Sequence, residues 1–109
     1  MSQSIAMKLL ILIPLAITVL TAATFTGTIT DSMCPTADHS QMRMGPTDAE
    51  CSKACVSIHG AMYVLYDGKN VYELSDQKTP EMFAAKKVKV TGTLDAKTKT
   101  IKVDSITAQ

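Results

Sequence analysis

The sequence has almost no net charge. Its 109 residues carry eleven Lys and Arg side chains against ten Asp and Glu, a formal net charge of +1 at pH 7. Proteins that bind nucleic acid rely on a basic surface that displaces counterions from the phosphates. We therefore expect no nucleic-acid partner, and the charge gives no reason to expect binding to an anionic membrane. The sequence leaves a protein or small-ligand partner unidentified.

The sequence also lacks an apolar run long enough to cross a bilayer comfortably, which takes about 20 residues. Its longest run, residues 9–20, follows Lys8 and precedes a small-x-small site, a pattern typical of a secretory signal peptide. We predict a signal peptide over residues 1–23 and an exported protein, periplasmic or secreted, beginning near Thr24. The alternative is an uncleaved N-terminal anchor. Cleavage removes Lys8 and no acid, so the mature chain is formally neutral.

Recognisable enzyme motifs are missing as well. The thioredoxin spacing Cys-x2-Cys does not occur. Cys55 and His59 are four residues apart and could pair a thiol with a base, but no third orienting group or oxyanion loop can be identified. We therefore predict that the protein is not an enzyme.

Apolar residues alternate with polar ones in three stretches, which predicts five strands. Residues 24–30 form the first strand, and Gly27 within it suggests a bulge or a sharp bend. Residues 61–74 form two strands joined at an Asp-Gly turn, a strong hairpin signal. Residues 86–108 form a second hairpin that turns near residues 95–98.

Two helices are expected between these strands. Thr47 and Glu50 form a capping box, and Gly60 supplies a helix end, so a helix is predicted over residues 48–58. Pro80 suits the first turn of a second, short helix between the two hairpins.

The order of these elements favours a mainly β fold. Five strands with a helix between the third and fourth is the order of the oligonucleotide/oligosaccharide-binding (OB) fold, a small five-stranded barrel. The helix that carries two cysteines is an addition between strands one and two. We predict one OB-like domain over residues 24–109. The alternatives are a small β-sandwich and a small open antiparallel sheet with helices on one face.

Three segments of the mature chain carry a family resemblance: "TGTITDSMC", "DAECSKAC" and "KKVKVTGTLDAKTKTIKVDSI". Together they resemble a family of short exported bacterial proteins classed as a domain of unknown function. That family shares a first strand ending in Ser-Met-Cys, a later Cys-x3-Cys and a C-terminal V-x-V-x-G-x-L hairpin. The resemblance implies export and a single small domain, but no activity.

Soft metal ligands are concentrated in residues 31–60, which hold all three cysteines, both histidines and three of the seven methionines. Cys51 and Cys55 are four apart on the predicted helix, so their side chains face the same way. Their Cβ atoms would be about 5–6 Å apart, wider than the roughly 3.5–4.5 Å of a disulfide. One hypothesis is therefore a disulfide from Cys34 to either Cys51 or Cys55, with one thiol left over.

The other hypothesis is a metal site. Cys34, Cys51 and Cys55 with a histidine, His39 or His59, make a known structural zinc set. The thioethers of Met33, Met42 and Met44 would favour copper(I). The sequence thus predicts a copper or zinc site without excluding the disulfide, and His59 also suits a helix-end cation.

The alternative function is a disulfide-stapled module that binds a ligand or a protein without catalysis. Tyr63, Tyr66 and Tyr72 fall near the face that OB folds use for ligands. They suit packing or a place at the rim equally well, since three tyrosines without a basic groove make no single-strand platform. The lysines of the last hairpin fit a solvated face that protects a sheet edge.

Overall fold

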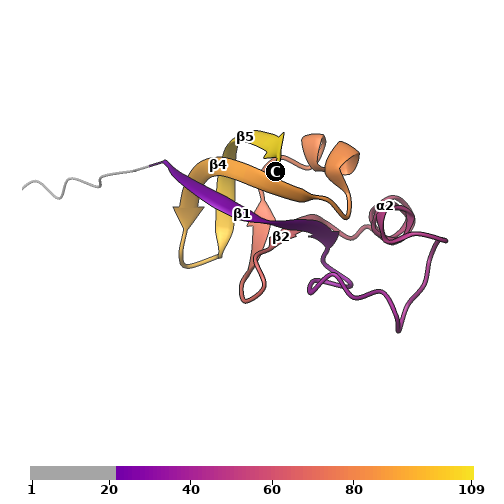
Figure 1. The fold of residues 1–109 in the computed structure, drawn as a ribbon. Coiled ribbons are helices and arrows are strands. Elements are labelled where there is room, and N and C mark those ends of the chain that lie inside the picture. Colours follow the sequence, from indigo (N-terminus) through magenta and orange to yellow (C-terminus); the bar gives the residue numbers. More distant parts are fainter. Residues whose placement is uncertain (1–21) are drawn as a thin grey trace, which may run out of the picture.

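A computed structural model describes residues 22–109. The predicted signal peptide over residues 1–23 therefore lies outside the described residues, except for its last two. Figure 1 shows a small β structure with one α-helix at its side. The elements are β1 (Ala23–Asp31), α2 (Asp48–His59), β2 (Tyr63–Tyr66), β3 (Val71–Leu74), the 3-10 helix η2 (Thr79–Phe83), β4 (Lys87–Asp95) and β5 (Thr100–Ala108). This is the order predicted from the sequence.

The five strands form one mixed sheet that closes in a ring, in the order β1-β2-β3-β5-β4. β1 pairs antiparallel with both β2 and β4, and β4 pairs antiparallel with β5. A short parallel pairing of β3 with β5, through Leu74 and Ile101, completes the ring. The predicted mainly β fold with five strands is confirmed. Across residues 22–109, no helix has the length and apolarity that a bilayer span requires.

The core fills the inside of this ring. Its buried side chains come from all five strands and from the end of η2: Ile29, Tyr63, Leu65, Leu74, Ala84, Val88, Val90, Ile101 and Ile106. Each large aliphatic side chain among them stabilises the fold by about 1.5–3 kcal/mol through removal from water.

The three tyrosines pack against other side chains or lie at the rim. This was one of the two interpretations of these residues, and the other was a ligand-binding face. Tyr63 lies in the core. The ring of Tyr72 packs against Phe25 at a centroid distance of 5.5 Å. The hydroxyl of Tyr66 donates to the carbonyl of Gly68 at 3.1 Å, within the β2–β3 turn. They do not form a stacking platform.

The ends of α2 follow their sequence signals. The hydroxyl of Thr47 accepts a hydrogen bond from the Glu50 amide at 3.1 Å, and Gly60 ends the helix in the left-handed conformation at φ 71°. The buried residues of α2 are Cys51, Ser52 and Cys55. α2 packs beside the end of β1 (Figure 1), where the hydroxyl of Ser52 donates to the carboxylate of Asp31.

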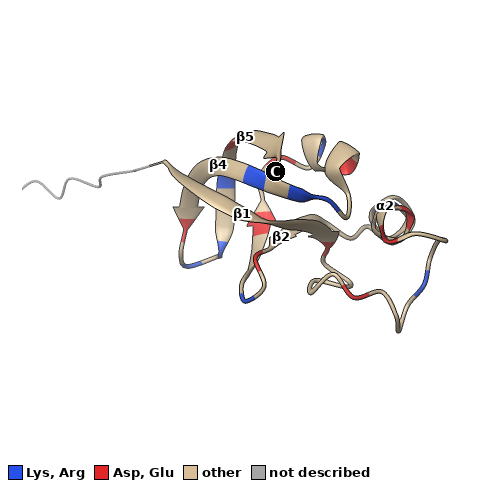
Figure 2. Cartoon of the chain, in the orientation of Figure 1, with Lys and Arg blue, Asp and Glu red and all other residues tan. Residues whose placement is uncertain are grey.

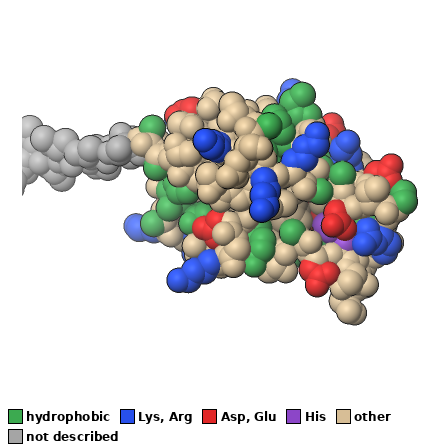
Figure 3. Space-filling model, viewed as in Figure 1, with side chains coloured by type: hydrophobic (Ala, Val, Ile, Leu, Met, Phe, Trp, Pro, Cys, Tyr) green, Lys and Arg blue, Asp and Glu red, His purple; other side chains and the backbone are tan. Residues whose placement is uncertain are grey.

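The lysines of the last hairpin are exposed, as predicted. They are Lys86, Lys87, Lys89, Lys97, Lys99 and Lys102. Figure 2 shows basic residues on β4 and β5 with acidic residues on the neighbouring turns. On the face drawn in Figure 3, side chains of both signs are interspersed.

Gly27 offers a test of how the ring closes. A Cβ added there would collide with the backbone carbonyl of Tyr66, at the place where β1 passes from β4 to β2. We predict that Gly27→Ala lowers the free energy of unfolding by about 1–3 kcal/mol because backbone must move. Urea unfolding measures this, with Thr26→Ala at the exposed neighbour as the control. Equal losses in the two variants would contradict the close approach.

Candidate metal centre

Asp31, the last residue of β1, is fully buried and accepts four hydrogen bonds. Its Oδ1 accepts from the backbone amides of Met33 (3.0 Å) and Cys34 (2.9 Å). Its Oδ2 accepts from Nε2 of His39 (2.8 Å) and from the hydroxyl of Ser52 (2.9 Å). One carboxylate therefore joins the strand end, the loop after it and α2.

These contacts keep Asp31 ionised. Burial by itself would raise the pKa of the carboxyl. The hydrogen bonds from His39, Ser52 and the Cys34 amide, with the charge of His39, outweigh burial and hold the pKa below its usual 3.8. The site therefore contains a buried negative charge at neutral pH.

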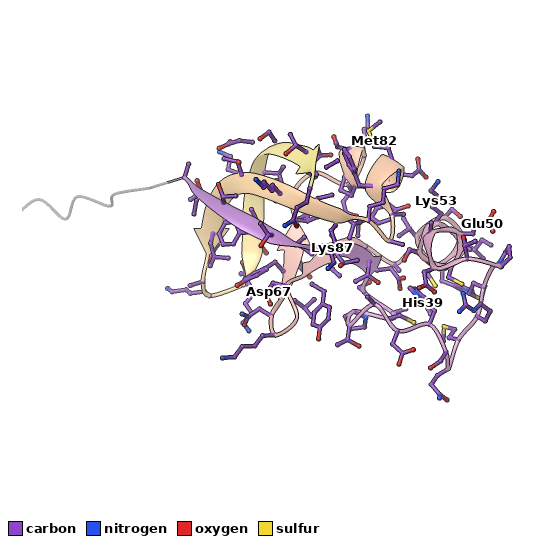
Figure 4. The ribbon with its side chains drawn as sticks, viewed as in Figure 1. His39, Glu50, Lys53, Asp67, Met82 and Lys87 are labelled. Carbon is purple, nitrogen blue, oxygen red and sulfur yellow. The ribbon has the colours of Figure 1, made fainter. Side chains whose placement is uncertain are left out.

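Asp31, Cys34 and His39 are all buried, and one ligand atom from each lies within 4.8 Å of the others. Small shifts would bring these atoms to the 2.0–2.3 Å bonds that zinc makes with oxygen, nitrogen and sulfur. Figure 4 shows His39 between α2 and the loop after β1, with sulfur atoms nearby. The fold thus brings together an oxygen, a sulfur and a nitrogen ligand.

The imidazole of His39 has one satisfied and one unsatisfied nitrogen. Nε2 faces Asp31 and lies 3.3 Å from the hydroxyl of Ser52. Nδ1 is buried without a hydrogen-bond partner, 3.7 Å from Oδ1 of Asp48. An unsatisfied buried polar atom costs about 1–3 kcal/mol. The ring is thus incompletely paired.

All three cysteines are free thiols in the structure, so the predicted disulfide from Cys34 to Cys51 or Cys55 is not formed. Burial first, and then the negative charge of Asp31, raise the pKa of the Cys34 and Cys55 thiols. Both are therefore protonated at neutral pH, which argues against a nucleophilic thiolate.

The thiol of Cys51 has partners of its own. It donates to the carbonyl of Gly45 at 3.2 Å and lies 3.4 Å from Nη1 of Arg43. The same guanidinium nitrogen lies 3.2 Å from Oδ1 of Asp48. A cation and a carbonyl thus hold this sulfur on the loop side of α2.

The remaining predicted ligands do not join the group. His59 is exposed in the last turn of α2, where it suits a helix-end cation. Met33 and Met42 are exposed and Met44 is half-buried. The group of three within ligand distance contains none of these four residues, and it contains neither Cys51 nor Cys55.

Sequence reasoning missed Asp31 and Ser52. The predicted first strand ends at residue 30, but β1 extends to Asp31. Alternation along β1 puts Asp31 on the same face as Ile29, so an acid on the inward face was a readable signal. Ser52 follows Cys51 on the buried face of α2, and only the docking of the helix reveals its role.

Comparison with models of known protein families, with curated proteins and with solved structures finds no match to this chain.

The buried carboxylate yields a prediction with a defined pH window. Because the folded-state pKa of Asp31 lies below the unfolded value, its stabilising effect is present above about pH 4 and is lost as the pH falls through the lower folded pKa. We predict that Asp31→Asn lowers the free energy of unfolding by about 3 kcal/mol at pH 7, since it removes the buried carboxylate that accepts four hydrogen bonds.

The same variant should lose less stability at pH 3, because there the unfolded wild-type chain takes up a proton at Asp31 more readily than the folded protein does. Urea unfolding at both pH values measures the difference. Asp104→Asn, at an exposed position on β5, is the control. An equal loss at pH 7 and pH 3 for Asp31→Asn would contradict the role assigned to the charge.

Proposed function

We propose that this protein is an exported, non-enzymatic domain that binds one transition-metal ion, zinc or copper, through Asp31, Cys34 and His39. The observation that carries the proposal is the buried group of three ligand atoms within 4.8 Å of one another. The free thiols support it, because a disulfide would compete for the sulfur of Cys34. In an oxidising compartment, coordination would also protect such thiols.

The ligand types favour zinc over copper(I). Zinc accepts carboxylate, thiolate and imidazole together, whereas copper(I) selects soft sulfur ligands. Asp31 and a Cys34 thiolate would also place two negative charges in a buried site. A divalent ion neutralises both negative charges, whereas a monovalent ion neutralises only one of them. The exposed positions of Met33 and Met42 weaken the thioether argument for copper.

We further propose that the ring of strands is an OB-like barrel and that the chain belongs with the exported family that its motifs resemble. The order β1-β2-β3-β5-β4, with η2 between β3 and β4, supports the OB-like assignment.

A second candidate function is ligand binding on the β2–β3 face. A groove of about 460 Å³ lies there between the loop after β1 and the β4–β5 turn. Its lining includes Pro35, Val64, Val71, Glu73 and Lys99. OB folds bind oligosaccharides on this face. Chemical-shift changes at Val64 and Val71 on titration with a soluble trisaccharide would support this candidate, and an unchanged spectrum would count against it for that ligand.

The metal proposal predicts different behaviour for the two histidines. Reduced, metal-free wild-type protein should bind about one equivalent of zinc in calorimetry and unfold at a higher temperature when loaded. Loss of one ligand in His39→Ala should weaken zinc binding by more than about tenfold. His59→Ala should bind as the wild type does, because that side chain is exposed and outside the group. A wild type that takes up no zinc or copper would overturn the proposal.

Metal binding should also release protons. The pKa of the Cys34 thiol is raised by burial and by Asp31, so the thiol must lose its proton when it becomes a ligand. We predict that log K for zinc falls by about one unit per pH unit, for each thiol deprotonated, as the pH is lowered from 8 to 7. Competition with a chelator of known affinity measures this slope. A pH-independent affinity would mean that no thiol is coordinated.

A further inference from the structure

The buried imidazole of His39 has one nitrogen to which the ligand set gives no role. Nε2 faces Asp31, 2.8 Å from its Oδ2, and is therefore the ring atom placed to bind an ion. Nδ1 is buried and has no hydrogen-bond partner. We propose that Asp48 is a positioning residue of the site: its carboxylate accepts a hydrogen bond from Nδ1 and so leaves the lone pair of Nε2 to the ion. This inference rests on the proposed function and adds a residue outside the ligands.

Binding of an ion decides where the imidazole carries its proton. A neutral ring has one N–H group and one lone pair, so a ring that gives the Nε2 lone pair to an ion carries its proton on Nδ1. Inside a protein this N–H group needs an acceptor, because an unsatisfied buried donor is costly. Histidine ligands of metal ions accordingly donate the other ring N–H to a carboxylate, a backbone carbonyl or a water. The partner of Nδ1 is therefore part of the site.

Asp48 supplies a carboxylate beside Nδ1. Its Oδ1 lies 3.7 Å from that nitrogen. An N–H···O hydrogen bond has a length of about 2.7–3.2 Å, so a movement of about 0.5–1 Å forms the bond. Asp48 is the first residue of α2 and directly follows the capping residue Thr47. The start of the helix thus fixes the backbone of Asp48, and the helix dipole favours its negative charge.

Arg43 contacts the same oxygen of Asp48. Its Nη1 lies 3.2 Å from Oδ1. The side chains of Arg43 and Asp48 are half exposed, whereas that of His39 is only 2% exposed. Oδ1 of Asp48 therefore adjoins both the buried ring and a cation at the surface. Asp48 does not belong to the group of three within ligand distance, so it would act on the ion through His39.

Zinc affinities of paired variants test this role. Asp48→Ala should bind zinc about ten- to a hundredfold more weakly than the wild type, which is the usual loss when such a partner is removed. Asp48→Asn should recover part of this loss, because its amide oxygen can still accept from Nδ1. Glu50→Gln is the control, since it removes one negative charge from the same helical turn at an exposed position. It should bind zinc as the wild type does.

A merely structural role for Asp48 would lower the melting temperature of the zinc-free variant and leave the zinc affinity unchanged. Thermal unfolding of zinc-free Asp48→Ala, Asp48→Asn and Glu50→Gln separates the two effects. Equal zinc affinities for Asp48→Ala and Glu50→Gln would overturn the inference and leave the proposed function standing.

Nitrogen-15 NMR reads the imidazole directly. In His59→Ala, His39 is the only histidine, so its ring signals are assigned at once. With zinc bound, the expected result is a proton on Nδ1 that exchanges slowly with solvent, and no proton on Nε2. Adding Asp48→Ala to this variant should make the Nδ1 proton exchange faster. A proton on Nε2 in the zinc-loaded protein would overturn the inference alone, whereas a wild type that binds no metal would overturn the proposed function as well.

Discussion

The buried negative charge of Asp31 is the constraint on which the candidate site depends. A carboxylate removed from water is costly unless its oxygens are hydrogen-bonded and its charge is balanced. Two backbone amides satisfy one oxygen, and His39 and Ser52 satisfy the other. Because both oxygens of Asp31 need hydrogen-bond donors, the loop after β1 and the buried face of α2 must place donors beside the carboxylate. Cys34 and His39 lie inside the protein because both hydrogen-bond to the carboxylate of Asp31, Cys34 through its backbone amide and His39 through Nε2.

The same charge explains why the site suits a cation. The Nε2 atom of His39 partners Oδ2 of Asp31, and the other ring nitrogen of His39 has no hydrogen-bond partner. Asp31 and His39 would hold a metal ion together with Cys34, and the ion would supply a positive charge beside the carboxylate. The amides on Oδ1 would keep the carboxylate in place. Preorganised ligands of this kind reduce the ordering cost of binding.

Local signals explain how far the sequence could predict this structure. The caps of α2 at Thr47 and Gly60, the Asp-Gly turn and the alternation in β4 and β5 each act over a few residues, and each was readable. The parallel pairing of β3 with β5 joins residues distant in the chain and leaves no such local mark. For the site, Cys34 and His39 were identified by their chemistry. Asp31 was missed because the predicted first strand ended one residue before it.

The sequence could not distinguish the surroundings of Cys51 from those of Cys55, because helical spacing turns both to one side. The partners of the Cys51 sulfur, Arg43 and Gly45, are brought to it only in the folded chain. The segment 32–47 adds a further point, since none of its residues belongs to the hydrophobic core. This segment is therefore held by hydrogen bonds to Asp31 and α2, whereas the ring of strands has its own apolar core. A metal ion bound to the same residues would stabilise the loop and α2 more than the ring of strands. The free energy of metal binding would then stabilise the ordered conformation of this segment.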